Sequence, residues 1–348
     1  MKGLFLTDVI SRYRTLKTNK IFSLPIVILM PHSRCNCRCV MCDIWKGNNN
    51  VQQLNESDIE KLLSSLKTLQ TKLVVMSGGE ALMHPNFFRL CDILRSYKIK
   101  ITILSTGLLL KKYAEEIIAK TNEVIVSLDG SQEVHNKIRN IPDAFNKLKE
   151  GVRELKNLNI EYRVTARCVV QKANFKDLPN IVDAAKDIGL DQISFLNADV
   201  STDAFNRPNL WEEKKVKEVR LSRDEVAQFK EIIENLINTH SQDFKSGFIA
   251  ESPEKLQRFY NYYAAFHSLC DFPTVTCNAP WVSAVIEADG SVRPCFFHKI
   301  IGNIKNQELV EILNSENTIT FRNNLDIKTN SICKKCVCSL NLSPLAKL

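Results

Sequence analysis

The sequence lacks the long apolar runs and the N-terminal signals that mark membrane and secreted proteins. No apolar stretch approaches the roughly 20 residues that a membrane-spanning helix needs. The N-terminal sequence MKGLFLTDVI turns polar before it builds an apolar region adequate for a signal peptide. Internal repeats and low-complexity tracts are also missing. These absences favour a cytoplasmic protein with no membrane partner.

Composition and charge are ordinary for a globular protein. The chain has 348 residues, of which 44% are hydrophobic and 25% charged, enough for one large domain and a smaller one. The formal net charge is +8, but Lys and Arg are scattered along the predicted helices. We therefore expect a solvated surface rather than a nucleic-acid-binding face. Twelve cysteines stand in closely spaced groups without an export signal, which favours reduced, metal-binding thiolates over disulfides.

The most informative group is Cys35, Cys39 and Cys42, spaced Cys-x3-Cys-x2-Cys after a short apolar run at 24–30. Three thiolates at this spacing can hold three irons of one cubane cluster and leave the fourth iron open, whereas a fully ligated cluster takes four cysteines. A zinc site or chance clustering is the alternative, although zinc prefers four ligands with paired spacing. Cys37 lies inside the motif and is interpreted as a non-ligand.

Apolar patterns predict an alternation of strands and helices from residue 25 to about 196, which indicates a parallel α/β sheet. Two helices carry capping-box signatures, Ser57 with Glu60 and Ser222 with Glu225. The segment 199–269 is predicted to be mostly helical and to cover the substrate. The predicted strands lie at 25–30, 72–76, 99–104, 123–128, 161–170 and 192–196, and the helices between them at 56–69, 85–97, 110–120, 143–158 and 178–189.

Chemically informative residues follow the predicted strands. Parallel α/β folds bind ligands at the carboxyl ends of their strands, so these segments are expected to meet. The segments are the cysteine motif, then Ser77-Gly78-Gly79-Glu80, then Ser105-Thr106-Gly107, then Asp129-Gly130, with Arg167 near the end of the fifth strand. Arg139 is expected either to pair with a carboxylate or to lie on a solvated helix face.

A second group of cysteines occupies the C-terminal third. Asp289-Gly290, between apolar runs at 281–286 and 291–293, is a strong hairpin signal. This hairpin would bring Cys277 and Cys295 together, and the later pair Cys333 and Cys336 can complete four ligands. A zinc ion held by four cysteines is the alternative to an iron–sulfur cluster. Cys270 and Cys338 are less certain ligands.

The Cys-x3-Cys-x2-Cys motif followed by Gly78-Gly79-Glu80 resembles the radical S-adenosylmethionine (SAM) superfamily over about residues 24–197. The resemblance implies a partial (β/α)6 barrel of the TIM type and a [4Fe–4S] cluster whose open iron binds SAM. It implies that Glu80 accepts from the SAM ammonium and that Met41, commonly aromatic in the family, contacts adenine. The resemblance also places the ribose or the methionine carboxylate of SAM near Ser105, Thr106, Ser127 and Asp129, for which strand-end capping is the alternative role. Arg167 is a further cofactor-binding candidate.

The C-terminal order Cys277-Asn-Ala-Pro-Trp, Gly290-x4-Cys295 and then paired cysteines resembles the SPASM/twitch extension of radical SAM enzymes. It implies one auxiliary [4Fe–4S] cluster in a small hairpin-and-helix extension. We therefore predict four regions: an N-terminal extension at 1–23, the partial barrel at 24–198, the helical segment at 199–269 and the auxiliary domain at 270–348.

The resemblance implies an enzyme that reductively cleaves SAM to a 5′-deoxyadenosyl radical, which abstracts hydrogen from an unactivated C–H bond. The first-ranked substrate is a peptide, as in maturases of ribosomally made peptides, and the expected electron donor is of the flavodoxin or ferredoxin type. Alternatives are a small-molecule dehydrogenase of sugars or alcohols and a porphyrin side-chain decarboxylase. A non-catalytic iron–sulfur electron carrier is a different class, disfavoured by the Gly-Gly-Glu motif.

Overall fold

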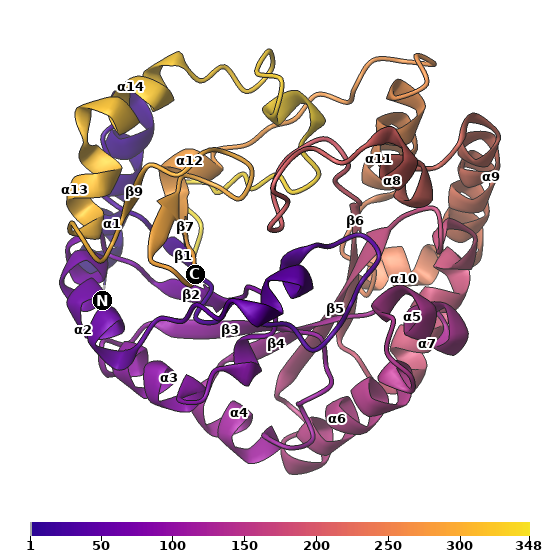
Figure 1. Cartoon of the computed structure of the whole chain (residues 1–348), viewed down its shortest axis with the longest axis horizontal. Coiled ribbons are helices and arrows are strands. Elements are labelled where there is room, and N and C mark those ends of the chain that lie inside the picture. Colours follow the sequence, from indigo (N-terminus) through magenta and orange to yellow (C-terminus); the bar gives the residue numbers. More distant parts are fainter. Residues whose placement is uncertain (1) are drawn as a thin grey trace.

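The computed structural model describes the chain from residue 2 to residue 348, so the first residue of the predicted N-terminal extension lies outside the described residues. One curved sheet of nine strands runs through the molecule in the order β6-β5-β4-β3-β2-β1-β7-β8-β9. The sheet is open and parallel from β6 to β7 (Figure 1). The predicted α/β class and partial barrel are therefore confirmed. The strands are β1 (Ile26–Leu29), β2 (Leu73–Met76), β3 (Lys100–Ser105), β4 (Glu123–Ser127), β5 (Arg163–Val170), β6 (Gln192–Asn197), β7 (Ser283–Ile286), β8 (Ser291–Arg293) and β9 (Gly302–Asn303).

Helices line the outer side of the curved sheet, as Figure 1 shows, and their apolar faces form one core with the strands. Buried aliphatic side chains of β1 to β6 pack against them, which explains why these strands are rich in Val, Ile and Leu. The helices that cover the outer side of the barrel strands are α2 (Glu56–Thr68), α3 (Phe87–Ser96), α4 (Ala114–Lys120), α5 (Gln132–Arg139), α6 (Ala144–Leu158) and α7 (Leu178–Ile188).

The start of α2 corrects one sequence prediction. The capping box consists of Asn55 and Asp58 rather than Ser57 and Glu60. The Asn55 side chain accepts from the Asp58 backbone N–H at 3.0 Å, and Asp58 accepts in return from the Asn55 N–H at 2.9 Å. Asparagine is as good an N-cap residue as serine, so the earlier of two competing signatures begins the helix.

The predicted C-terminal hairpin exists, but it is part of the main sheet. Strand β7 pairs antiparallel with β8 and also lies parallel to β1, with Ile26 opposite Ser283 and Leu29 opposite Ile286. All four residues of β7 are buried, which is typical of a strand inside a parallel sheet. The hairpin is therefore joined directly to the strand that precedes the first cysteine motif.

The segment between β6 and the C-terminal region is mostly helical, as predicted. Its helices are α8 (Glu213–Val219), α9 (Arg223–Thr239), α10 (Ser241–Ser246) and α11 (Pro253–Ala265). The predicted Ser222 and Glu225 capping box begins α9. Helix α11 is fixed to the barrel by buried Tyr263, whose hydroxyl donates to the Val170 carbonyl at 2.6 Å and accepts from the Ala198 N–H at 3.1 Å.

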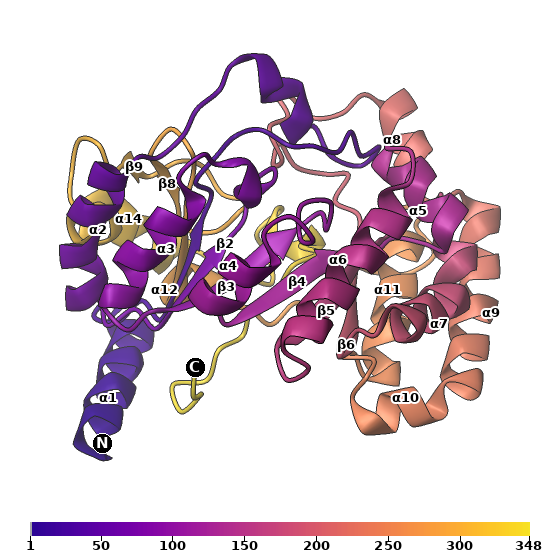
Figure 2. The same cartoon turned by 90° about the horizontal axis from the view of Figure 1, so that it is seen from below.

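The remaining helices lie near the two ends of the chain. Helix α1 (Lys2–Thr18) projects from the body of the molecule (Figure 2). Short helices α12 (Ala279–Val282), α13 (Leu309–Asn314) and α14 (Glu316–Asn324) flank β7 to β9. None of the described helices is both long enough and apolar enough to cross a membrane.

Candidate active site

Cys35, Cys39 and Cys42 lie in the loop that leaves the carboxyl end of β1. Burial raises the pKa of Cys35 and of Cys42 to about 12, and the neighbouring Cys39 thiol adds to both shifts. The three side chains are therefore close enough to affect one another's ionisation. Thiols with such pKa values stay protonated at neutral pH, so their thiolates need a bound metal to replace the lost hydration. This environment suits metal ligands.

Within the described part of the chain, no three His, Cys, Asp or Glu side chains are arranged to hold one metal ion. A cubane cluster places each thiolate on a different iron, so its ligands surround the cluster instead of converging on one point.

Cys37 points into the protein beside Cys39. Its side chain is 1% exposed, and its backbone N–H donates to the Cys35 sulfur at 3.5 Å. A hydrogen bond between the Cys37 and Cys39 thiols raises the pKa of Cys37. The same hydrogen bond, together with the charge of Arg139, lowers the pKa of Cys39 to about 7. Cys39 is thus the thiol most readily ionised in this loop.

The Gly-Gly-Glu segment after β2 packs directly on the cysteine loop. The Glu80 backbone N–H donates to the Arg34 carbonyl oxygen at 2.8 Å. A Cβ atom added at Gly79 would stand 2.1 Å from that same oxygen and 3.0 Å from the Cβ of Cys35. Gly78 has φ of 112°, which side chains rarely tolerate. Both glycines are therefore required by close backbone contact in this structure.

The Glu80 carboxylate is fully buried and bonded to the end of β3. It accepts from the Thr106 backbone N–H at 2.7 Å, from the Thr106 hydroxyl at 2.6 Å and from the Ser105 hydroxyl at 3.1 Å. The described contacts of these three predicted cofactor-binding residues are therefore mainly with one another. The Thr106 hydroxyl also lies 2.9 Å from the Asn36 side-chain oxygen, which links β3 to the cysteine loop.

Asp129 and Arg139 form a buried ion pair at the end of β4. Asp129 is completely buried, and its second carboxylate oxygen accepts from the Val169 N–H at 2.8 Å. The alternative of a solvated Arg139 is thereby excluded. The structure gives Asp129 a partner inside the protein, which corresponds to the capping role considered above. Ser127 and Arg167 lie opposite each other on β4 and β5, with the Arg167 Nε 3.4 Å from the Ser194 hydroxyl.

A second buried ion pair was missed by the sequence analysis. Arg207 donates to Asp199 at 2.7 Å, with side chains 1% and 2% exposed, in the loop after β6. Arg207 also donates to the Met41 backbone carbonyl at 3.4 Å, next to Cys42. The Met41 side chain packs on a small apolar cluster that includes Val200. The sequence around Arg207 reads only as a loop, since nothing in the pattern pairs it with Asp199.

Burial and neighbouring cysteines, Cys277 among them, raise the pKa values of four C-terminal thiols, those of Cys295, Cys333, Cys336 and Cys338. These five cysteines therefore lie close together, whereas Cys270 does not join them. The Cys270 thiol instead donates to the Asn261 carbonyl at 3.5 Å. His298, also missed, places its Nε2 at 3.3 Å from the sulfur of Cys333. The five cysteines are the four predicted ligands, Cys277, Cys295, Cys333 and Cys336, together with Cys338, one of the two less certain ligands.

The C-terminal cysteines come near strand β5. Cys338 is exposed to solvent. Surrounding atoms raise the pKa of its thiol, and the positive charges of Arg167 on β5 and Lys255 on α11 oppose that rise, so the thiol lies within range of both side chains. Arg167 lies three residues before the carboxyl end of β5. Figure 1 shows the C-terminal segment, in yellow, running across the side of the molecule opposite strands β3 to β5.

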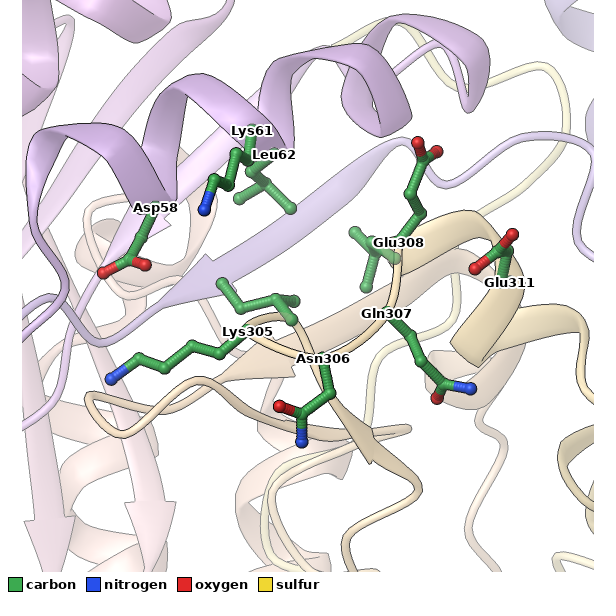
Figure 3. A pocket seen from close by; sticks show the side chains of 10 residues that line it. Asp58, Lys61, Leu62, Lys305, Asn306, Gln307, Glu308 and Glu311 are labelled. Atoms are coloured by element: carbon green, nitrogen blue, oxygen red, sulfur yellow. The ribbon is translucent and has the colours of Figure 1, made fainter.

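Two surface pockets lie away from both cysteine groups. One of about 490 Å³ lies between α2 and the loop before α13, and Figure 3 shows Asp58 and Lys61 facing Lys305 and Asn306 across it. Another of about 510 Å³ lies beside α6 and α7. Neither is lined by a cysteine, so neither belongs to the candidate active site.

Two models of known families match the two parts of the chain that carry the cysteine groups. Residues 29–185 match the model of the radical SAM superfamily. Residues 277–337 match the SPASM model, described as an iron–sulfur cluster-binding domain. The first match contains Cys35, Cys39, Cys42 and the Gly-Gly-Glu segment, and the second contains Cys277 to Cys336.

Individual relatives extend the comparison. A cysteine-type anaerobic sulfatase-maturating enzyme of Clostridium perfringens is 24% identical over 90% of this chain and 86% of its own length. The Fe-coproporphyrin III synthase of Methanosarcina barkeri is 27% identical over 49% of this chain, a match that spans 43% of that relative. The crystal structure of Streptococcus suis SuiB bound to precursor peptide SuiA shares the fold, with a TM-score of 0.63, 16% identity and coverage of 94% of this chain and 73% of that one.

The two family models cover the cysteine motif in the loop after β1 and the hairpin with Cys277 and Cys295 on either side of it. The chain therefore combines a radical SAM domain with a C-terminal SPASM iron–sulfur cluster-binding domain, and it is a radical SAM enzyme.

Proposed function

We propose that this enzyme modifies a peptide by abstracting a hydrogen atom from an unactivated C–H bond. The observation that carries the proposal is the near full-length similarity to the Clostridium enzyme, which is named for maturing a sulfatase. SuiB, which shares the fold over most of this chain, has been solved with a precursor peptide bound. The names of both relatives thus point to polypeptide substrates.

Cys35, Cys39 and Cys42 would hold a [4Fe–4S] cluster whose open iron binds SAM. When bound, this pair of cofactors supplies a 5′-deoxyadenosyl radical after one electron arrives from a flavodoxin- or ferredoxin-type donor. The chain's own part is to bind and orient these groups at the carboxyl ends of the strands. Gly78 and Gly79 allow close backbone approach there, and Glu80 fixes the end of β3 through Thr106.

The substrate would lie between the two cysteine groups. Cys277, Cys295, Cys333 and Cys336 would hold an auxiliary [4Fe–4S] cluster, which four thiolates would ligate fully. Such a cluster suits electron transfer from the substrate side or a structural role, because it leaves no iron open. Arg167 adds a positive charge that suits a carboxylate of a peptide substrate.

The proposal is tested in two steps with anaerobically reconstituted protein. Reduction in the presence of SAM should give 5′-deoxyadenosine, and the variant Cys35→Ala/Cys39→Ala/Cys42→Ala should give none. Short peptides encoded beside the gene should then change mass in the presence of the wild-type enzyme only. Cleavage of SAM without any change in these peptides would retain the radical chemistry and refute the peptide substrate.

A porphyrin substrate is the second candidate, because the Fe-coproporphyrin III synthase is similar to about half of the chain. That match covers less than half of the relative's length, whereas the maturase match covers most of it. Mass analysis of more highly carboxylated porphyrin-type precursors incubated with the reduced enzyme distinguishes the two, since formation of Fe-coproporphyrin III would favour the porphyrin reaction.

A further inference from the structure

One charged side chain reaches a cysteine of the first motif from a different part of the barrel. The Arg139 Nη1 donates to the sulfur of Cys39 at 3.4 Å. Arg139 ends helix α5, and its other terminal nitrogen binds Asp129. Its Nε has no hydrogen-bond partner among the described residues, so a buried donor remains next to the cysteine loop. The guanidinium is thus in position to act on whatever Cys39 binds.

The position of Arg139 is fixed on every side. Asp129 is held by the Val169 N–H at 2.8 Å, and the Asp129 backbone carbonyl accepts from Asn174 at 2.9 Å. The main chain of α5 also binds the cysteine loop, because the Arg139 carbonyl accepts from the Arg38 N–H at 3.0 Å. The contact to Cys39 therefore belongs to a rigid network rather than to a mobile surface side chain.

We propose that Arg139 is a positioning residue that sets the reduction potential of the cluster held by Cys39. Reduction adds one negative charge to a cluster, and a hydrogen bond or positive charge at a ligand sulfur stabilises that added charge. In a buried site this effect is weakly screened. Asp129 partly cancels the charge of Arg139, so the positive potential at the cluster is smaller than Arg139 alone would produce.

The proposal rests on the ligand role of Cys39 and is independent of the substrate. Iron content and 5′-deoxyadenosine formation report the ligand role, and the potential of the cluster reports Arg139. A wrong assignment of Cys39 as a ligand can therefore be distinguished from a wrong assignment of Arg139 as the residue that sets the potential.

The test compares Asp129→Asn with Asp129→Asn/Arg139→Met, which avoids leaving an unpaired buried carboxylate. The amide oxygen of the introduced asparagine can still accept from the Val169 N–H. Anaerobic redox titration follows the electron paramagnetic resonance signal that changes on adding SAM, which identifies the cluster with the open iron. Asp129→Asn should shift its potential upward. The double variant should be harder to reduce than the single one by about tenfold in the equilibrium constant, equal to about 59 mV for one electron.

The matched control is the second buried pair, with Asp199→Asn and Asp199→Asn/Arg207→Met. Arg207 donates to a backbone carbonyl of the motif and not to a sulfur, so its removal should change the equilibrium constant less than removal of Arg139. Equal shifts in the two series would overturn the proposal, as would an unchanged potential in an iron-replete Arg139 variant. If the double variant cannot hold the cluster, Asp129→Asn alone decides, because a downward or absent shift there refutes the charge argument.

Discussion

Replacement of Gly79 by alanine tests whether the two loops at the cofactor site are in direct backbone contact. The added methyl would lie 2.1 Å from the Arg34 carbonyl oxygen and 2.6 Å from its carbonyl carbon. These are backbone atoms, so no side-chain rotation relieves the overlap. The two loops must separate by roughly 1 Å or more, and a displacement of about 1 Å at a reacting site can cost about a hundredfold in rate.

We therefore expect Gly79→Ala to lower the rate of 5′-deoxyadenosine formation, per bound iron, by about a hundredfold. Overpacking of this kind typically costs about 1–3 kcal/mol, so the fold itself should survive. Gly47→Ala is the control, because the added methyl there meets only the end of the Asn206 side chain, at 3.2 Å. Near wild-type SAM cleavage by Gly79→Ala would show that the loops are not packed as the structure has them.

Three further predictions use single substitutions. Glu80→Gln should weaken the charged hydrogen bonds to Thr106, by about 1 kcal/mol each because the amide oxygen still accepts, and reduce SAM affinity while iron content stays. A lower thermal midpoint with unchanged SAM affinity by titration would leave Glu80 only its role in holding β3. Cys277→Ala should remove about four irons per chain, whereas Cys270→Ala should remove none by iron and sulfide analysis, since Cys270 lies apart from the other thiols. Tyr263→Phe should lower the free energy of unfolding of the apoprotein in urea by about 1–3 kcal/mol, because two buried backbone groups lose their partner; an unchanged midpoint would contradict the assigned hydrogen bonds.

Local sequence patterns were sufficient for most of the barrel. Each strand from β1 to β6 is a short apolar run bounded by polar or turn residues, so periodicity located all six within a few residues. The cysteine motif and the Gly-Gly-Glu segment were found because their spacing is local. No bounds were predicted for helix α5, since QEVHNKIR has few apolar residues; its buried side chains are those of His135, Ile138 and Arg139.

Contacts between distant parts of the chain could not be predicted in this way. Arg139 and Cys39 are separated by 100 residues, and no local pattern states which carboxylate or sulfur a given arginine meets. The pairing of β7 with β1 was missed for the same reason, because apolar residues alone do not specify a neighbour. Buried ion pairs cost desolvation and must be closely matched, so they depend on the finished fold.

The loop after β6 shows why the helical segment is more than a connection between two cluster domains. Arg207 donates to the Met41 carbonyl beside the first cysteine motif, and Trp211 donates to Asp43 at 2.9 Å. In the same loop Phe205 stacks on Phe296, next to Cys295 of the second cysteine group, with ring centroids 6.0 Å apart. Phe205 has φ of 62°, a conformation that costs about 1–3 kcal/mol unless surrounding contacts hold it. The loop is therefore held by contacts beside both cysteine groups, and it ties the helical segment to each of them.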